Sequence, residues 1–147
     1  MEKIQISKEQ ELNLITDLKK RVSLGMIFII IGLIGIIPIG ITLFNDADTS
    51  YYSSGTFAFT IIGIILIGQS DAAAKGIKKG DYQAYKTECK KVGWEFASVK
   101  NNDVLSKKVT KEIKKVAILG STKAIKAGDE IGIIQAGKEF WAFPLSE

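Results

Sequence analysis

Little in this 147-residue chain is equipped for chemistry, because it has no histidine and a single cysteine, Cys89. Histidine is the side chain that most often exchanges protons near neutral pH, and zinc sites are built largely from cysteine and histidine. Cys89 lies in the segment KTECKK, whose lysines could lower the pKa of the thiol and make it nucleophilic. A small, half-buried residue explains Cys89 more simply, and no intramolecular disulfide can form.

The other candidate groups are one pair of carboxylates and one possible anion cradle. Asp129 and Glu130 are the only adjacent acidic residues after the long apolar segments, and a turn that precedes a strand accounts for them without catalysis. Ser121, Thr122 and Lys123 follow a glycine and could bind an anion, but a turn or a short 3₁₀ helix fits the same residues. No phosphate-binding, dinucleotide-binding or nucleophile-elbow motif occurs in a usable setting. We therefore expect no catalytic, cofactor-binding or metal-binding residues.

Two long stretches without a charged residue dominate the organisation of the chain. They span residues 22–45 and 49–70, and only Asp46, Ala47 and Asp48 separate them. At about 1.5 Å per residue, a helix of either length would measure about 33–36 Å, enough to cross a hydrocarbon core of about 30 Å. The sequence therefore predicts a transmembrane helical hairpin over residues 22–70 with a short outer loop.

Basic residues flank the predicted hairpin at both of its ends but not in its loop. Residues 19–21 are all basic, and Lys75, Lys78 and Lys79 follow the second stretch. The positive-inside rule then predicts a multi-pass membrane protein with both termini in the cytoplasm. A cleaved signal peptide is the alternative, but the first apolar stretch begins late and lacks a small-residue cleavage site. Abundant lysine and isoleucine suit an AT-rich bacterial genome, so we expect the inner membrane of a bacterium.

Small residues recur along both apolar stretches at a spacing of seven. Such residues let helix backbones approach closely, and a proline should kink the first helix. The helix-packing candidates are Gly25, Gly32, Gly35, Pro38, Thr42, Thr56 and Gly63. They could join the two helices of one chain or several copies of the chain, and the short loop favours the first alternative. Neither stretch contains an ionisable residue of the kind that transporters and selective channels depend on.

The first 21 residues predict an amphipathic helix. Ser7 followed by Gln10 fits a capping box, with Lys8 as the first helical residue. The apolar residues that then share one face are Leu12, Ile15, Leu18 and Val22. This helix could lie in the membrane interface and run into the first span, or it could simply extend that span and pack on the soluble domain.

After the second span, the sequence predicts a helical linker over 71–80 and a small cytoplasmic β domain over 81–147. Residues from Tyr82 onward favour strands. Asn101-Asn102 could form a two-residue hairpin turn. In that register the facing pairs are Val99 with Val104, Glu95 with Lys108 and Trp94 with Val109. The segment 103–114 also has helical spacing, so helix and strand both stay open there.

The last twenty residues give a clearer pattern of strands and turns. Residues 130–135 and 139–143 predict strands, with turns at 127–129 and 136–138, and Pro144 ends the second strand. Such an arrangement is typical of small barrels of the OB or SH3 type, so we expect a mainly β domain. Its large aromatic residues could fill the core, and we take Trp94, Trp141 and Phe143 as candidates for an interaction surface.

The segment AIKAGDEIGIIQAGKEFWAFPL, together with GDYQAY after the second span, resembles the layout of small bacterial membrane proteins with two spans and a C-terminal β domain. More loosely, the spacing of six residues resembles the tail of NfeD-type domains, which are membrane-tethered OB barrels. These residues are Ile125, Gly128, Ile131, Ile133, Gly137 and Phe143. The resemblance implies partnership with membrane scaffold proteins of the stomatin and flotillin kind.

Charge bears on the partners of the domain. Residues 71–147 carry fifteen lysines and ten acidic residues, a net charge of +5, which could hold the domain on anionic lipid or simply keep it soluble. Arg21 is the only arginine, and because arginine is favoured for base and phosphate recognition, we expect no nucleic-acid partner.

We therefore expect a non-enzymatic, membrane-anchored protein whose β domain binds another protein within a bacterial inner-membrane assembly. The alternative is a homo-oligomeric membrane element that acts through its transmembrane helices.

Overall fold

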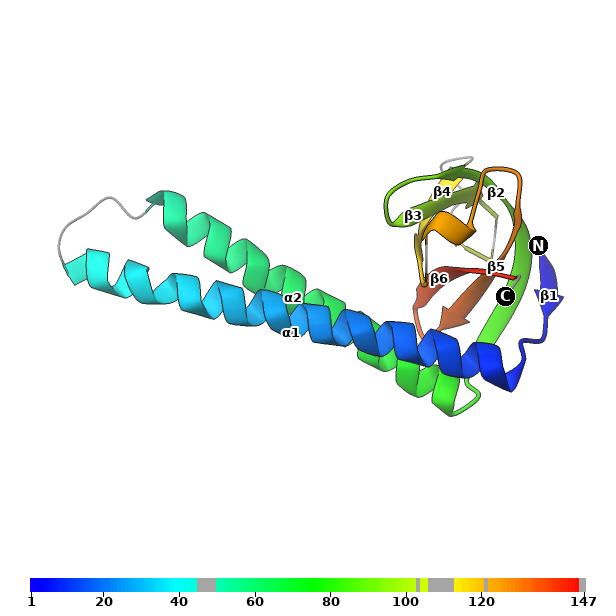
Figure 1. Ribbon diagram of the computed structural model, residues 1–147, viewed down its shortest axis with the longest axis horizontal. Coiled ribbons are helices and arrows are strands. Elements are labelled where there is room, and N and C mark those ends of the chain that lie inside the picture. The colour runs from blue at the N-terminus through cyan, green and yellow to red at the C-terminus, as the bar shows by residue number, and fades with distance from the viewer. Residues whose placement is uncertain (45–49, 103, 106–112, 121, 146–147) are drawn as a thin grey trace. The chain divides into compact units, whose positions relative to one another are not determined.

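The computed structural model describes residues 1–44, 50–102, 104–105, 113–120 and 122–145, with helical side chains given up to Ile36 and from Gly55 onward. In chain order the elements are β1 (Glu2–Ile4), α1 (Lys8–Phe44), α2 (Ser50–Lys78), β2 (Tyr82–Val92), β3 (Phe96–Lys100), β4 (Ile113–Ile118), the 3₁₀ helix η1 (Thr122–Ala124), β5 (Glu130–Ala136) and β6 (Glu139–Pro144) (Figure 1). They form two units, residues 1–17 with 72–147 and residues 18–71. We call the first the barrel unit and the second the helix pair.

Five strands of the barrel unit close into a small barrel. The strands follow the order β2-β3-β4-β6-β5, and β5 pairs again with β2 to complete the circle. Closure is possible because β2 is eleven residues long, pairing with β5 over Tyr82 to Glu88 and with β3 from Cys89 onward. All neighbours are antiparallel except β4 and β6, which run parallel. The prediction of a small β-barrel is therefore confirmed.

The strand β1 was not predicted. It adds to the barrel antiparallel to β2, with Glu2 opposite Lys86 and Ile4 opposite Ala84, and Figure 1 shows it beside that strand. Only three residues long, β1 lacks the alternating pattern that marks a strand in the sequence. Its pairing ties the start of the chain to a strand that follows both helices.

Aliphatic side chains fill the interior of the barrel, and Phe143 is buried on the opposite face of β6. Strand β5 contributes Ile131 and Ile133, which are buried, and the Phe143 ring lies over Gly132 on the paired position of β6. A Cβ on Gly132 would lie 2.5 Å from two ring carbons of Phe143 and nearer still to a third. Glycine at this position therefore leaves the space that the phenylalanine ring occupies.

The last two strands and their turns agree with the sequence analysis. Strands β5 and β6 cover the predicted segments, and Gly137, at the turn between them, has φ 65°. A positive φ of this kind is easily reached only by glycine, which explains why the tight turn could be found in the sequence. The predicted 3₁₀ alternative after Gly120 is also confirmed, as η1.

The predicted hairpin at Asn101-Asn102 is wrong. Val99 pairs with Lys114, fifteen residues later, and not with Val104. Asn102 instead forms a local turn, its side-chain oxygen accepting a hydrogen bond of 3.1 Å from the Leu105 backbone N–H, and Leu105 is buried in the core. Residues 113–118 form a strand, whereas residues 103 and 106–112, for which helix and strand stayed open, lie outside the described residues.

Helix α1 begins as predicted and runs on into the first apolar stretch. The capping box is confirmed, because the Ser7 N–H donates to Gln10 Oε1 at 3.0 Å and the Gln10 N–H donates to Ser7 Oγ at 3.1 Å. From there the helix continues without a break to Phe44. Its first ten residues belong to the barrel unit, where Leu14 is buried and Leu12 is 64% exposed. The alternative in which this segment packs on the β domain is the one observed.

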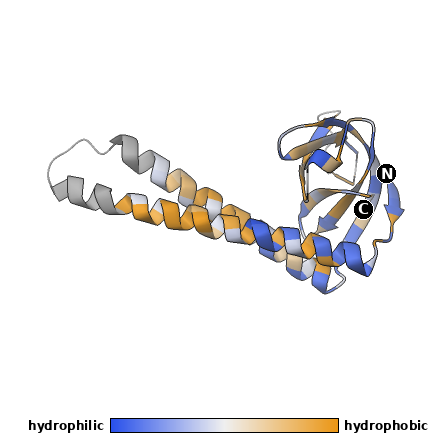
Figure 2. Ribbon diagram, in the orientation of Figure 1, coloured by the Kyte–Doolittle hydropathy of each residue, from blue (hydrophilic) through white to orange (hydrophobic). Residues whose placement is uncertain are grey.

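The helix pair carries the apolar stretches. Figure 2 shows continuous hydrophobic colour along the described middle of both helices. Among the described residues, one stretch, Gly55–Lys78 of α2, is long and apolar enough to cross a membrane by length and composition. Helix α2 continues through the predicted linker to Lys78, and Gly80 follows with φ 74°.

Candidate functional site

The candidate groups for catalysis, Cys89, Asp129 and Glu130, are buried or engaged in structural contacts. Cys89 is fully buried, and burial raises the pKa of its thiol, which disfavours the reactive thiolate. Asp129 Oδ2 accepts a hydrogen bond of 2.7 Å from the Lys126 N–H within a turn, and Glu130 pairs with Lys86 at 2.6 Å. Across the described part of the chain, no three His, Cys, Asp or Glu side chains gather as a metal site would require.

The three candidate surface aromatics lie in different environments. Trp94, in the turn between β2 and β3, is 90% exposed, whereas Trp141 is only 3% exposed and Phe143 only 2%. The last two are therefore buried rather than surface residues. Ala142 between them belongs to the barrel core, so by strand alternation Trp141 and Phe143 are buried on the opposite face of β6. An exposed tryptophan is unusual, since burying so large a ring would be favourable.

The helix-packing candidates meet each other within one chain. A Cβ on Gly25 would lie 2.9 Å from the Gly63 carbonyl oxygen, and a Cβ on Gly32 would lie 3.0 Å from the Thr56 carbonyl oxygen. Gly35 likewise lies against the Thr56 side chain. The Phe28 and Phe59 rings stack nearby, with centroids 5.7 Å apart. Side chains are not described at Pro38 and Thr42.

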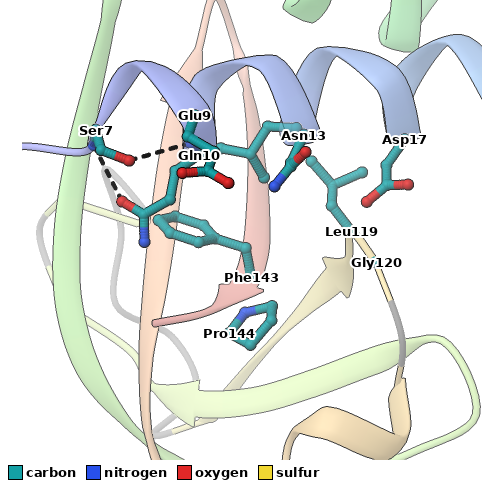
Figure 3. A pocket seen from close by; sticks show the side chains of 10 residues that line it. Ser7, Glu9, Gln10, Asn13, Asp17, Leu119, Gly120, Phe143 and Pro144 are labelled. Atoms are coloured by element: carbon teal, nitrogen blue, oxygen red, sulfur yellow. Dashed lines mark hydrogen bonds between the residues drawn. The ribbon is translucent and has the colours of Figure 1, made fainter. Parts of the chain in front are cut away.

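A groove of about 390 Å³ opens in the barrel unit between the start of α1 and two chain segments of the barrel. Figure 3 shows Glu9, Asn13 and Asp17 along one side of the helix, facing Phe143 and Pro144. The remaining lining residues are Ser7, Gln10, Leu14, Leu119 and Gly120. Two carboxylates and two side-chain amides thus lie over an apolar floor, and none of the described lining residues is a lysine or an arginine. We call this feature the acidic groove.

The walls of the acidic groove are held by specific contacts. The Tyr82 hydroxyl donates a hydrogen bond to Glu11 Oε1 and so joins β2 to α1. Burial, followed by this bond to a carboxylate, raises the pKa of Tyr82 to about 12, so the tyrosine stays protonated and donating at neutral pH. On the barrel side, the Leu119 N–H donates to the Ala142 carbonyl at 2.7 Å. The groove is therefore a built feature of the barrel unit.

The sequence analysis missed the groove although a signal for it exists. Glu9, Asn13 and Asp17 are spaced four residues apart, which places them on one face of a helix. A face of this composition is ordinarily assigned to solvent. Only the packing of residues 8–17 beside the barrel, one of the two alternatives that the sequence left open, turns that face into one wall of a groove.

A second surface lies on the outer side of β3 and its neighbours. Ala97 and Val99 belong to the core, so Phe96, Ser98 and Lys100 point outward in alternation. The strand register sets Ser98 opposite Lys91 of β2 and opposite Lys115 of β4. We call the outward residues Lys91, Phe96, Ser98, Lys100 and Lys115 the lysine face. Trp94 lies two residues before Phe96, at its edge.

Comparison of the chain with known protein families, with curated proteins and with solved structures finds no match.

Proposed function

We propose that the chain is a two-span membrane anchor that holds its OB-type barrel at the cytoplasmic face and docks a protein partner there. Three observations support the anchor. The two helices approach closely at small residues that we call the seam glycines, Gly25, Gly32, Gly35 and Gly63. One stretch of α2 is long and apolar enough to cross a membrane, and α1 carries a second charge-free stretch. Basic residues lie directly before the apolar stretch of α1 and soon after that of α2. By the positive-inside rule, these residues support the cytoplasmic orientation.

The pairing of β1 with β2 gives independent support for an even number of crossings. Residues before the first apolar stretch pair with residues after the second, and Glu11 bonds Tyr82 across the same boundary. Two segments in direct contact must lie on the same side of a membrane. A chain with a single crossing between residues 17 and 72 could not form this barrel unit.

The acidic groove is the observation that carries the docking role. A volume of about 390 Å³ is large enough for the side chains of a partner segment. Glu9 and Asp17 give the groove negative charge, in a barrel unit that is otherwise rich in lysine, and Phe143 with Leu119 gives it an apolar floor. Charge complementarity therefore favours a partner segment that carries basic residues beside an apolar one.

The rival function is a homo-oligomer that acts through its helices. The seam glycines that would join several copies already contact the neighbouring helix of the same chain. Their space is filled within one copy, and we therefore favour the anchor with a docking barrel.

Reversal of charge at the acidic groove tests the docking role. The chain, tagged before Met1, is extracted from its native cells in mild detergent, and proteins that co-purify at stoichiometric levels are identified. We expect Glu9→Lys to lose the partner almost completely, because a carboxylate that meets a base of the partner is replaced by a like charge. Glu95→Lys, an equal reversal at the exposed β2–β3 turn, should retain it.

Equal recovery of the partner with both variants would contradict the groove as the docking site. Recovery of the wild-type chain alone, at a discrete multiple of its own 16.1 kDa, would contradict the docking role and favour the homo-oligomer.

A further inference from the structure

The lysine face groups positive charge around one nearly buried hydroxyl. Residues directly opposite in an antiparallel pair have Cβ atoms about 4.5–5.5 Å apart and point to the same side. Lys91 and Lys115 therefore flank Ser98 from the two neighbouring strands. Ser98 is 8% exposed, whereas both lysines are exposed. Two ammonium groups and a hydroxyl can in this way surround the oxygen atoms of one phosphate group.

Among the described residues, the strands β3 and β4 carry basic side chains without acidic ones. Lys100 adds a third exposed base two residues from Ser98. Lys90, at the bulge in β2, is by contrast paired with Glu88 at 2.7 Å. The lysine face is thus a basic surface within a sheet and differs from the mixed charges around it.

Large apolar side chains border the basic residues. Phe96 is 46% exposed on the same outer side of β3, and Trp94 is 90% exposed in the adjoining turn. Tryptophan beside lysine is the combination enriched where protein meets the headgroup region of a bilayer, because the ring enters the interface while the ammonium groups stay among phosphates. A solvated surface gives no reason for both aromatic rings to remain exposed.

The chain connectivity keeps the lysine face near a bilayer. Ile67 is the last large apolar residue of the second charge-free stretch, and eleven more residues of α2, about 16 Å of helix, lead to Lys78. Strand β2 begins at Tyr82, after a connection of three residues. The tether raises the effective concentration of headgroups at the barrel far above that of any soluble anion.

We infer that the lysine face docks the barrel on the anionic leaflet of the membrane that the chain's own helices cross, with Lys91, Ser98 and Lys115 contacting lipid phosphates and Trp94 entering the interface. The inference rests on the proposed anchor but not on the protein partner. It also assigns the two charged surfaces of the barrel unit to different ligands, lipid to the lysine face and protein to the acidic groove.

Trp94 fluorescence provides the test on the full-length chain in vesicles. The chain has two tryptophans, and since Trp141 is buried, Trp94→Phe gives the baseline to subtract. Vesicles contain phosphatidylcholine alone or with one part in three of phosphatidylglycerol, each with or without brominated acyl chains. In anionic vesicles at low salt we expect Trp94 to be quenched by brominated lipid and protected from acrylamide. Both effects should disappear in phosphatidylcholine and at high salt.

Two matched double variants separate this face from general positive charge. Lys91→Glu with Lys115→Glu should weaken docking by about fivefold or more for each lysine, which removes the bromolipid quenching. Lys123→Glu with Lys138→Glu changes net charge equally at exposed sites outside the face and should leave the quenching intact. Unchanged Trp141 emission shows that each variant is folded.

Three outcomes would overturn the inference. In the first, Trp94 in anionic vesicles at low salt is accessible to acrylamide and is not quenched by brominated lipid. In the second, both double variants lose the quenching equally. In the third, Trp94 is protected from acrylamide without bromolipid quenching, which indicates that protein covers it. Flotation of the chain with the vesicles reports the anchor separately, so a chain that fails to float identifies failure of the anchor itself.

Discussion

Gly132→Ala is expected to destabilise the barrel unit by about 2–3 kcal/mol, the range of a severe overpacking substitution. Gly132 lies directly opposite Phe143 on the paired strand, and the added methyl group would fall within 2.5 Å of two ring carbons. Phe143 is buried and cannot swing into solvent without exposing its own ring and the apolar residues beside it. For a small domain with about 5–15 kcal/mol of total stability, this is a large fraction. Denaturant unfolding in detergent, followed by Trp141 emission in a Trp94→Phe background, measures the change.

The control for Gly132 is a second glycine of the same barrel. Gly93→Ala places its methyl group 3.5 Å from the Phe96 carbonyl oxygen, an ordinary contact, and should shift the unfolding midpoint little. Combining Gly132→Ala with Phe143→Leu should recover part of the loss, because the smaller side chain vacates the collision. Equal midpoints for Gly132→Ala and Gly93→Ala would contradict the packing described for β5 and β6.

Gly63→Leu is expected to separate the two helices of the pair. A Cβ at position 63 would lie 2.6 Å from the Gly25 carbonyl oxygen and 3.0 Å from the Ile29 backbone nitrogen. Both atoms belong to the backbone of α1, so no side-chain rotation relieves the overlap and the helices must part. Close approach through small residues is the main source of helix association in lipid.

Pyrene excimer emission measures this separation. In a Cys89→Ala background, cysteines replace Phe28 and Phe59, whose rings stack across the two helices, and both are labelled with pyrene. The excimer should be present in the parent and in Gly68→Leu, since position 68 has no atom within 4 Å, and absent in Gly63→Leu. Excimer that persists in Gly63→Leu would contradict the seam. Excimer that falls on dilution with unlabelled chain would show contact between copies instead.

Local chemistry made much of the fold predictable. The tight turn at Gly137, the strands on either side of it and the capping box of Ser7 and Gln10 all depend on residues close together in the sequence. Small residues at regular spacing likewise indicated the seam that Gly25 and Gly63 form. In each case the residue type itself restricts the backbone or the approach of a neighbour, so the pattern has few alternative explanations.

Long-range pairing could not be predicted in the same way. Asn101-Asn102 is a good hairpin turn by residue type, yet the structure closes β3 against a strand that begins at Ile113. The predicted register placed Glu95 opposite Lys108 and so hid the neighbourhood of Lys91, Ser98 and Lys115, which only the true register reveals. Asn101-Asn102 satisfies the local requirement of a hairpin turn, whereas the choice of the partner strand depends on residues farther along the chain that the local pattern does not specify.

Both surfaces proposed to bind ligands arise from segments that are distant in the sequence. Residues 9 and 143 meet in the acidic groove, and residues 91 and 115 meet on the lysine face. The two surfaces carry opposite charge. In the proposed account, the anionic membrane therefore binds the lysine face, and the acidic groove stays available for a protein. Trp141 and Phe143, expected at the surface, are instead buried.

The most direct test of the account is the side of the membrane on which the barrel lies. Fully buried Cys89 should not react, so the wild-type chain is a silent background for introduced cysteines. Lys138→Cys lies in the exposed turn after β5, and Asp46→Cys lies in the segment that connects the two helices. With a membrane-impermeant maleimide, we expect Asp46→Cys to be labelled in intact cells and Lys138→Cys to be labelled only after the cells are opened. Labelling of Lys138→Cys in intact cells would contradict the two-span anchor with a cytoplasmic barrel.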